Sequence, residues 1–148
     1  CFKIRKIWIR RNRKMSGYKS TSHCKYLCQY HIIFCPKFRY SVLKGNIETS
    51  LKEILIGVAK RYEYEIIQME VMPDHIHIFV GAKPTVAPID IVRVFKSITA
   101  IELFKKYPKL KSFYGRCGSL WSVGKFISTI GNVSAETIKK YIADQKGK

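Results

Sequence analysis

Apolar residues recur along the chain at two different spacings, and the change from one spacing to the other separates strands from helices. Alternation of apolar and polar positions, with short apolar runs, predicts strands over residues 26–35, 65–72, 75–81 and 120–130. Spacings of three and four predict a helix whose apolar stripe is Ile47, Leu51, Ile54, Leu55, Val58, Ala59 and Tyr62. A second helix is predicted over residues 89–107, because Pro88 favours its start and Pro108 its end.

A short capped helix is predicted at the C-terminus, after a turn at Gly131-Asn132, with Ser134 as its N-cap. The order βαββαβ followed by this helix predicts an α+β protein with a ferredoxin-like sandwich. Two helices would then cover one face of an antiparallel sheet. The other face stays open, and the C-terminal helix could cover it.

His75 and His77 lie two residues apart in the third predicted strand. Alternation directs both imidazoles to one face of the sheet, while Ile76, Ile78 and Val80 point to the other face, where helices can bury them. Two neutral imidazoles side by side can bind one divalent metal and leave coordination positions open for substrate. The alternative is a structural pair, solvated or hydrogen-bonded.

Tyr141 and Gln145 are four residues apart on the predicted C-terminal helix, so they share a face and could present a phenol and an amide oxygen to one site. A terminal tyrosine taken alone is more often a packing residue. The histidine strand followed by this helix resembles the HUH nucleases, in particular the single-tyrosine transposases of insertion sequences that move as single-stranded DNA. The resemblance covers nearly all of the chain after Met15 and includes residues 30–39, 121–122 and 128–131.

The resemblance implies that His75, His77 and Gln145 hold a divalent metal, Mg²⁺ or Mn²⁺, and that Tyr141 is the nucleophile. It implies a transposase that cleaves and rejoins single-stranded DNA at element ends through a covalent 5'-phosphotyrosine, leaving a free 3'-hydroxyl. It also implies DNA with hairpin ends as the partner. The resemblance further favours a homodimer with shared active sites, in which the histidines of one chain face Tyr141 and Gln145 of the other.

The charge of the chain agrees with a nucleic-acid partner. There are 28 basic and 10 acidic residues, a net charge of +18, and such a positive field attracts phosphate backbones. Residues 1–14 carry many cations and no acid, and we expect a basic leader that is disordered or not native, ahead of a single domain over residues 15–148. No run of about 18 apolar residues occurs, so we expect no membrane partner.

Cysteine usage predicts the compartment. The chain has 5 cysteines, an odd number, with no Cys-x-x-Cys pair and no secretory signal before them. A reduced environment is the simplest interpretation, so we expect the cytoplasm of a prokaryotic cell, with action on chromosomal or plasmid DNA.

Predicted DNA contacts combine cations with aromatic rings. Lys37 and Arg39 lie just after the first strand, Arg93 and Lys96 lie on the second helix, and Trp121 offers a ring on which a base could stack. The alternative for each is a solvated charge or a core aromatic.

Two other functions remain open at this point. A non-catalytic nucleic-acid-binding domain on the same ferredoxin-like frame would use His75 and His77 structurally. An HUH nuclease could instead serve replication initiation or repeat processing. A covalent adduct with single-stranded DNA would exclude the first of these, and imperfect palindromes flanking the gene would argue against the second.

Overall fold

One antiparallel sheet organises the computed structural model, which describes residues 18–130 and 139–145. Its four strands are hydrogen-bonded in the order β4-β5-β3-β6. They are β3 (Cys28–Phe34), β4 (Glu65–Met72), β5 (His75–Ala82) and β6 (Phe126–Thr129). The first of these strands in the chain therefore lies between the third and the fourth, which is the strand order of a ferredoxin-like sheet. The predicted fold class is confirmed.

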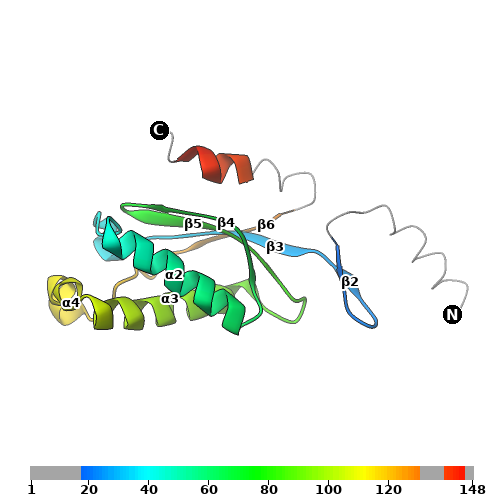
Figure 1. The fold of residues 1–148 in the computed structure, drawn as a ribbon, viewed down its shortest axis with the longest axis horizontal. Coiled ribbons are helices and arrows are strands. Elements are labelled where there is room, and N and C mark those ends of the chain that lie inside the picture. Colours follow the sequence, from blue (N-terminus) through cyan, green and yellow to red (C-terminus); the bar gives the residue numbers. More distant parts are fainter. Residues whose placement is uncertain (1–17, 131–138, 146–148) are drawn as a thin grey trace, which may run out of the picture.

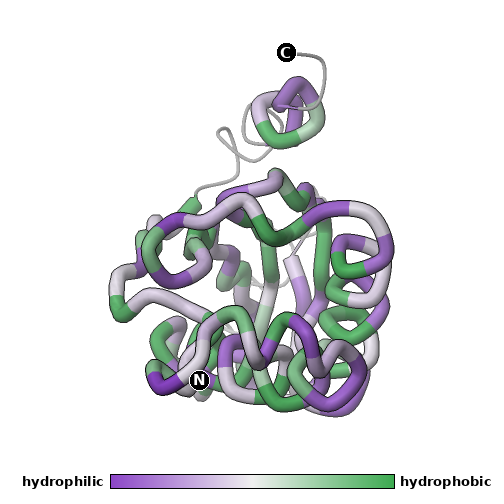
Figure 2. The backbone as a smooth tube through the Cα atoms, turned by 90° about the vertical axis from the view of Figure 1, so that its left-hand side faces the viewer, coloured by the Kyte–Doolittle hydropathy of each residue, from purple (hydrophilic) through white to green (hydrophobic). Residues whose placement is uncertain are grey.

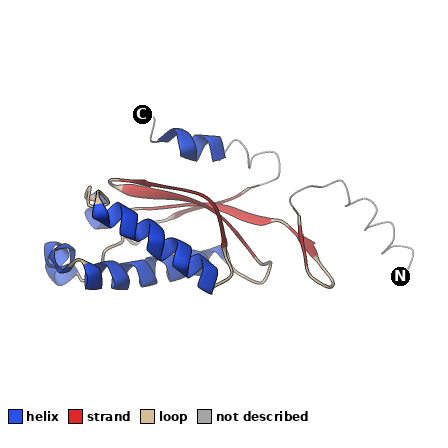
Figure 3. Ribbon diagram, viewed as in Figure 1, coloured by secondary structure: helices blue, strands red, loops and turns tan. Residues whose placement is uncertain are grey.

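Helices α2 (Asn46–Arg61) and α3 (Pro88–Lys106) cover one face of this sheet (Figure 1). Their apolar sides bury Leu51, Leu55 and Phe95 against the sheet residues Ile32 and Ile78 in one continuous core. On the other face lies only a short helical segment, residues 139–145, among the residues that the structure describes (Figure 3). The sheet therefore has one fully packed face and one face with a single small cover.

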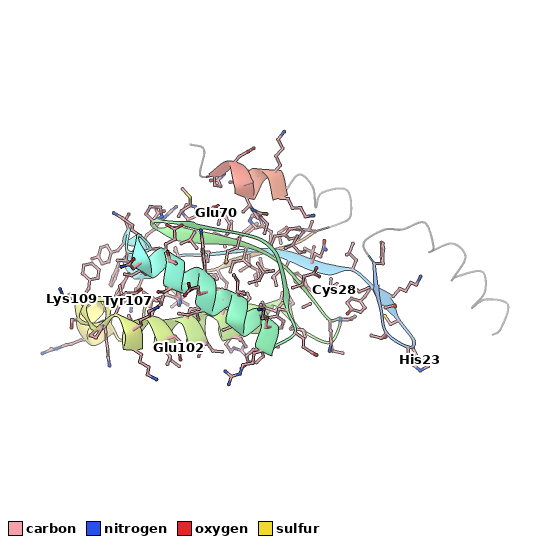
Figure 4. All side chains as sticks on the ribbon, viewed as in Figure 1. His23, Cys28, Glu70, Glu102, Tyr107 and Lys109 are labelled. Atoms are coloured by element: carbon pink, nitrogen blue, oxygen red, sulfur yellow. The ribbon has the colours of Figure 1, made fainter. Side chains whose placement is uncertain are left out.

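The histidine strand and its neighbour begin and end close to their predicted positions, because the turn at Pro73-Asp74 separates two runs rich in apolar residues. The first strand is shorter than predicted: residues 25–26 belong to β2 (Lys25–Tyr26), which pairs with β1 (Lys19–Ser20) in a separate hairpin. Figure 4 shows His23 at the tip of this hairpin, far from the sheet centre. The hairpin was not predicted, because strands this short leave no periodic signal.

Pro108 has a second role that the sequence analysis missed. It ends α3 as predicted, but it is also the first residue of α4 (Pro108–Tyr114), because proline is well tolerated in the first turn of a helix. After α4 and the short turn η2 (Gly115–Cys117), the chain returns to the sheet. The predicted strand over residues 120–130 is reduced to β6, while Trp121 forms an isolated bridge with Pro36.

Several predicted features lie outside the described residues, namely the basic leader over residues 1–14, the turn at Gly131-Asn132 and the N-cap at Ser134. Of the predicted C-terminal helix, residues 139–145 are described and are helical. Within the described part of the chain, none of the helices combines the length and the apolar character that crossing a membrane requires.

Candidate active site on the open face of the sheet

The two faces of β5 differ as the alternation predicted. Ile76, Ile78 and Val80 are completely buried beneath α2 and α3. His75 and His77 point to the open face, with their ring centroids 4.9 Å apart. His77 is the more enclosed of the two, with 3% of its surface exposed. The histidine pair therefore stands side by side at the start of β5.

Asp74 holds the ring of His75. The Nδ1 atom of His75 lies 2.7 Å from the Oδ1 atom of Asp74, and the other carboxylate oxygen is 3.2 Å from the Nε atom of Arg39. The hydrogen bond to His75, supported by attraction from Arg39, lowers the pKa of Asp74. An ionised carboxylate can only accept, so Nδ1 of His75 donates, and in the neutral ring Nε2 then keeps its lone pair. That lone pair is available to a metal.

His31 on β3 holds the ring of His77 in a similar way. Its Nε2 atom lies 3.1 Å from the Nδ1 atom of His77, and both side chains are buried. Burial lowers the pKa of His31 and lowers that of His77 to about 4, with His75 and His31 adding to the latter shift. Both rings are thus neutral at neutral pH. When Nδ1 of His77 donates to His31, its Nε2 atom keeps a lone pair.

Residues 139–145 bring the tyrosine and the amide to the histidines. Ile142 is completely buried against Phe79 and Ile130, which anchors the segment to the open face. Figure 2 shows the backbone of this segment lying above the rest of the molecule. Tyr141 is 48% exposed, and its ring centroid lies 5.8 Å from that of His77. Gln145, one turn further along, lines a pocket together with His75, His77 and Tyr141. The four residues named from the sequence therefore meet within one chain.

The pocket that these residues share has a volume of about 360 Å³. Besides the histidines, Tyr141 and Gln145, it is lined by Ile33, Phe34, Cys35, Arg39, Gly124, Lys125 and Phe126. Arg39 and Lys125 are the cations among these residues, and they suit a phosphate. A size of this order accommodates part of a nucleotide.

A divalent metal fits the donors of this pocket. Among residues 18–130 and 139–145, no three His, Cys, Asp or Glu side chains are grouped so as to hold a metal ion. The amide oxygen of Gln145, which lines the pocket with the two histidines, is the candidate for a third protein ligand. Two imidazole nitrogens and one amide oxygen are acceptable to Mn²⁺ and Mg²⁺ and leave coordination positions for substrate oxygens.

The predicted DNA-contact residues divide into two groups. Lys37 and Arg39 form the short turn η1 (Lys37–Arg39), where Arg39 is exposed and lines the pocket. Arg93 is exposed on α3 and pairs with Asp90 at 3.0 Å. These three cations are within reach of a ligand at the surface.

Lys96 and Trp121 are engaged inside the protein. The Nζ atom of Lys96 donates to the carbonyl oxygens of Ser122 and Gly124 at 2.8 and 3.0 Å, so it holds the loop before β6. Only 5% of Trp121 is exposed, and its indole donates to Thr99 at 2.9 Å. Stacking of a base on Trp121 would need a ring face that this structure buries.

The sequence anticipated the two positioning contacts only in part. The contact of Asp74 with His75 was not predicted, although its position next to His75 in the chain was a usable signal. For His31 the sequence leaves two alternatives, a residue that supports the site or a buried histidine. Its contact with His77 depends on the pairing of β3 with β5, which opposes Ile33 to His77 and His31 to Phe79.

Known proteins similar to this chain are transposases. Residues 24–145 match the model of a family described as "Transposase IS200 like". The chain is 40% identical over 124 residues to the ISDra2 transposase TnpA of Deinococcus radiodurans. The aligned region covers 83% of this chain and 87% of that protein. It is 28% identical over 131 residues to the transposase for insertion sequence element IS200 of Salmonella typhimurium, covering 88% of this chain and 85% of that one.

Solved structures agree. A transposase structure from Deinococcus radiodurans R1 superposes with a TM-score of 0.71 at 32% identity, covering 86% of this chain and 97% of that one. A REP-associated tyrosine transposase bound to a REP hairpin superposes with a TM-score of 0.62 at 16% identity, covering 86% and 73%. At this identity the second likeness concerns the fold alone.

Proposed function

Since the chain belongs to the family of IS200-like transposases, we propose that it cleaves and rejoins single-stranded DNA at element ends through a covalent bond to Tyr141. One observation carries this proposal. The ring of Tyr141 lies 5.8 Å from that of His77, in a pocket that His75 and Gln145 also line. A nucleophile, neutral nitrogen donors and an amide thus share one cavity with two cations.

His75, His77 and Gln145 would hold Mg²⁺ or Mn²⁺, which when bound neutralises charge on a phosphate oxygen and orients the phosphate. Asp74 keeps the imidazole of His75 in the tautomer that leaves Nε2 free, and His31 does the same for His77 when it accepts the hydrogen bond from Nδ1. Arg39 and Lys125 add positive charge at the pocket wall. The protein's own part is therefore to orient the phosphate and to supply the nucleophile.

In the cleavage step the phenol oxygen of Tyr141 attacks phosphorus, and the bond from phosphorus to the 3' oxygen breaks. The phenol loses one proton and the departing 3' oxygen takes up one, so no proton is consumed. The product is a 5'-phosphotyrosine with a free 3'-hydroxyl. Because this linkage is another phosphodiester, a second 3'-hydroxyl can later displace Tyr141 and rejoin the strand without an external energy source.

A homodimer with shared active sites is part of the proposal. The segment over residues 139–145 is anchored by a small apolar cluster around Ile142, separate from the main core. Two copies could exchange this segment and make the same contacts, as in other domain-swapped dimers. A pocket formed within one chain contains the same residues as a pocket shared between two chains, so an experiment must distinguish the two arrangements.

The test of the function is a covalent adduct. Full-length protein is incubated with single-stranded DNA from the ends of its element and Mg²⁺ or Mn²⁺, and the products are separated under denaturing conditions. We expect a slow-migrating protein–DNA band that needs both the metal and Tyr141, with Tyr141→Phe as the matched control. DNA binding without any adduct at either metal would instead favour a non-catalytic binding domain.

A further inference from the structure

Three large aromatic side chains gather at the surface next to the pocket. Phe38, Tyr40 and Phe113 are 62%, 45% and 59% exposed. The ring centroids of Phe38 and Tyr40 are 5.5 Å apart, and those of Tyr40 and Phe113 are 5.2 Å apart. Beneath them the buried ring of Tyr114 contacts both Tyr40 and Phe113. We call the three exposed rings the aromatic surface. Clustered exposed rings usually mark a binding site.

The backbone beneath this surface is strained. Phe38 and Arg39 adopt φ angles of 60° and 54°, a left-handed conformation that bulky side chains rarely take. Strain of this kind persists where the surrounding structure requires a particular side-chain direction. Here the side chains of two consecutive residues lie in different places: that of Phe38 belongs to the aromatic surface, and that of Arg39 lines the pocket beside Asp74. The aromatic surface and the candidate active site are therefore linked through two consecutive residues of η1.

The charge around the aromatic surface identifies its ligand. The Nζ atom of Lys37 lies 5.6 Å from the ring centroid of Phe38. Residues 108–117, which carry Phe113, contain Lys109, Lys111 and Arg116 and no acidic residue. Lys109 lies on α4, at the end of the molecule opposite the hairpin (Figure 4). Exposed rings surrounded by cations suit a ligand that has flat apolar faces and regularly spaced negative charges. An unpaired nucleic-acid strand has this chemistry.

We propose that Phe38, Tyr40 and Phe113 form a stacking surface for unpaired bases of the DNA strand that flanks the cleaved phosphate. The identity of that strand rests on the proposed function, whereas the stacking itself does not depend on Tyr141. Aromatic stacking accepts any base, because every base has a flat face. The surface would hold the strand in place and leave the choice of sequence to other contacts.

The test compares two probes on the Tyr141→Phe protein, which cannot form an adduct. One probe is a thymidine oligonucleotide, and the other is an abasic oligonucleotide of the same length and charge. Affinities are measured by fluorescence anisotropy for Phe38→Ala and Phe113→Ala. The matched control is Tyr62→Ala, which removes a ring that is 43% exposed and stacks on Tyr64 at the C-terminal end of α2.

We expect each alanine variant to bind the thymidine strand about tenfold more weakly and the abasic strand as before, because only stacking is lost. Phe38→Tyr should restore the affinity, and Tyr62→Ala should leave both probes unchanged. The slope of affinity against salt should stay the same, since no phosphate contact is removed.

Three results would overturn the stacking surface: equal binding of both probes by the parent protein, unchanged thymidine binding in the alanine variants, or an equal loss for both probes. If Phe113→Ala changes the sedimentation of the protein while thymidine binding is unchanged, the surface is an interface between copies. The adduct assay is carried out separately, on the protein that keeps Tyr141. Base-dependent binding without an adduct would contradict the proposed nucleophile and leave the stacking surface intact.

Discussion

The ring nitrogens of His75 and His77 are controlled by two different neighbours, a carboxylate and a third histidine. Asp74 is adjacent in the chain and half-exposed, while His31 comes from another strand and is buried. Both contacts occupy Nδ1, so both histidines can present Nε2 to the same point. The chemistry of the pocket therefore depends on residues that do not themselves reach the substrate.

Replacing either histidine by alanine should abolish the adduct while leaving hairpin DNA binding within about twofold, because a metal ligand is not a phosphate-gripping cation. Binding of Mn²⁺, followed by calorimetry, should weaken in both His75→Ala and His77→Ala. Normal adduct formation at normal metal concentration in either variant would contradict the assignment. His23→Ala is the matched control, since His23 is exposed on the hairpin.

His31 should act by positioning His77. His31→Phe keeps an aromatic ring but cannot accept the hydrogen bond, so Mn²⁺ affinity should fall by about 10- to 100-fold. His31→Gln offers an amide oxygen as acceptor and should recover part of that loss. Calorimetric Mn²⁺ binding separates the two variants without any cleavage assay. If both variants bind Mn²⁺ like the parent, His31 is only a packing residue.

Burial of these histidines also predicts a pH dependence of stability. Burial lowers the pKa of His31 and that of His77, the latter to about 4, from 6.5 in the unfolded chain. Below about pH 6.5 the unfolded chain binds more protons, so the free energy of unfolding should decrease toward pH 4. His77 contributes up to about 1.4 kcal/mol per pH unit, and the lowered pKa of His31 adds a decrease of the same sign. Above pH 6.5 these two groups should contribute no slope.

Urea unfolding in the presence of a chelator measures this dependence. His31→Phe should reduce the slope, because one of the two buried imidazoles is then absent, and His23→Ala should leave it unchanged. A stability that does not vary between neutral pH and about pH 4 would show that neither histidine is held neutral by the fold.

At the scale of elements, the site depends on how one short segment is attached. Residues 139–145 contact the sheet through Ile142, which packs on Phe79 and Ile130 apart from the main core. Elements with few buried contacts open locally at low free-energy cost. The position of Tyr141 is therefore the least constrained part of the site.

Ile142→Ala should release this segment without unfolding the protein. Removing a buried isoleucine costs about 2–5 kcal/mol in a core, and here that cost falls on the docking of residues 139–145. Amide hydrogen exchange should become faster in this segment and stay unchanged in β5, and adduct formation should slow at least tenfold. Lys140→Ala, on the exposed side of the same segment, is the control. Equal exchange in both variants would contradict this anchoring role.

At the scale of the whole molecule, the open question is whether the pocket is completed by one chain or by two. Exchange of residues 139–145 between two copies would combine the histidines of one chain with Tyr141 of the other. The contacts within the pocket would be the same in both cases, so the geometry of a single chain is compatible with either arrangement.

Mixing Tyr141→Phe protein with His75→Ala protein distinguishes the two arrangements. Each variant should be inactive alone. In a shared-site heterodimer one site carries both mutations and the other carries none, so co-refolded heterodimers should regain up to about half of the parent activity per dimer. If verified heterodimers stay inactive while refolded parent protein cleaves, the sites are not shared and each chain uses its own Tyr141.

The amino-acid sequence alone determined the features that depend on local periodicity. Alternation along β5 was sufficient to assign His75 and His77 to one face and Ile76 to the other, because successive strand residues must point in opposite directions. The spacing of Tyr141 and Gln145 likewise placed them on one side of a helix. Local rules of this kind need no knowledge of neighbouring elements.

The tertiary structure alone decided which of these faces meet. The contact of His31 with His77 follows from strand pairing, and the burial of Trp121 follows from packing against Thr99, neither of which leaves a periodic signal. The aromatic surface likewise joins η1 to α4, which are far apart in the chain. Local spacing limits where a side chain can point, but long-range pairing and packing determine what it touches.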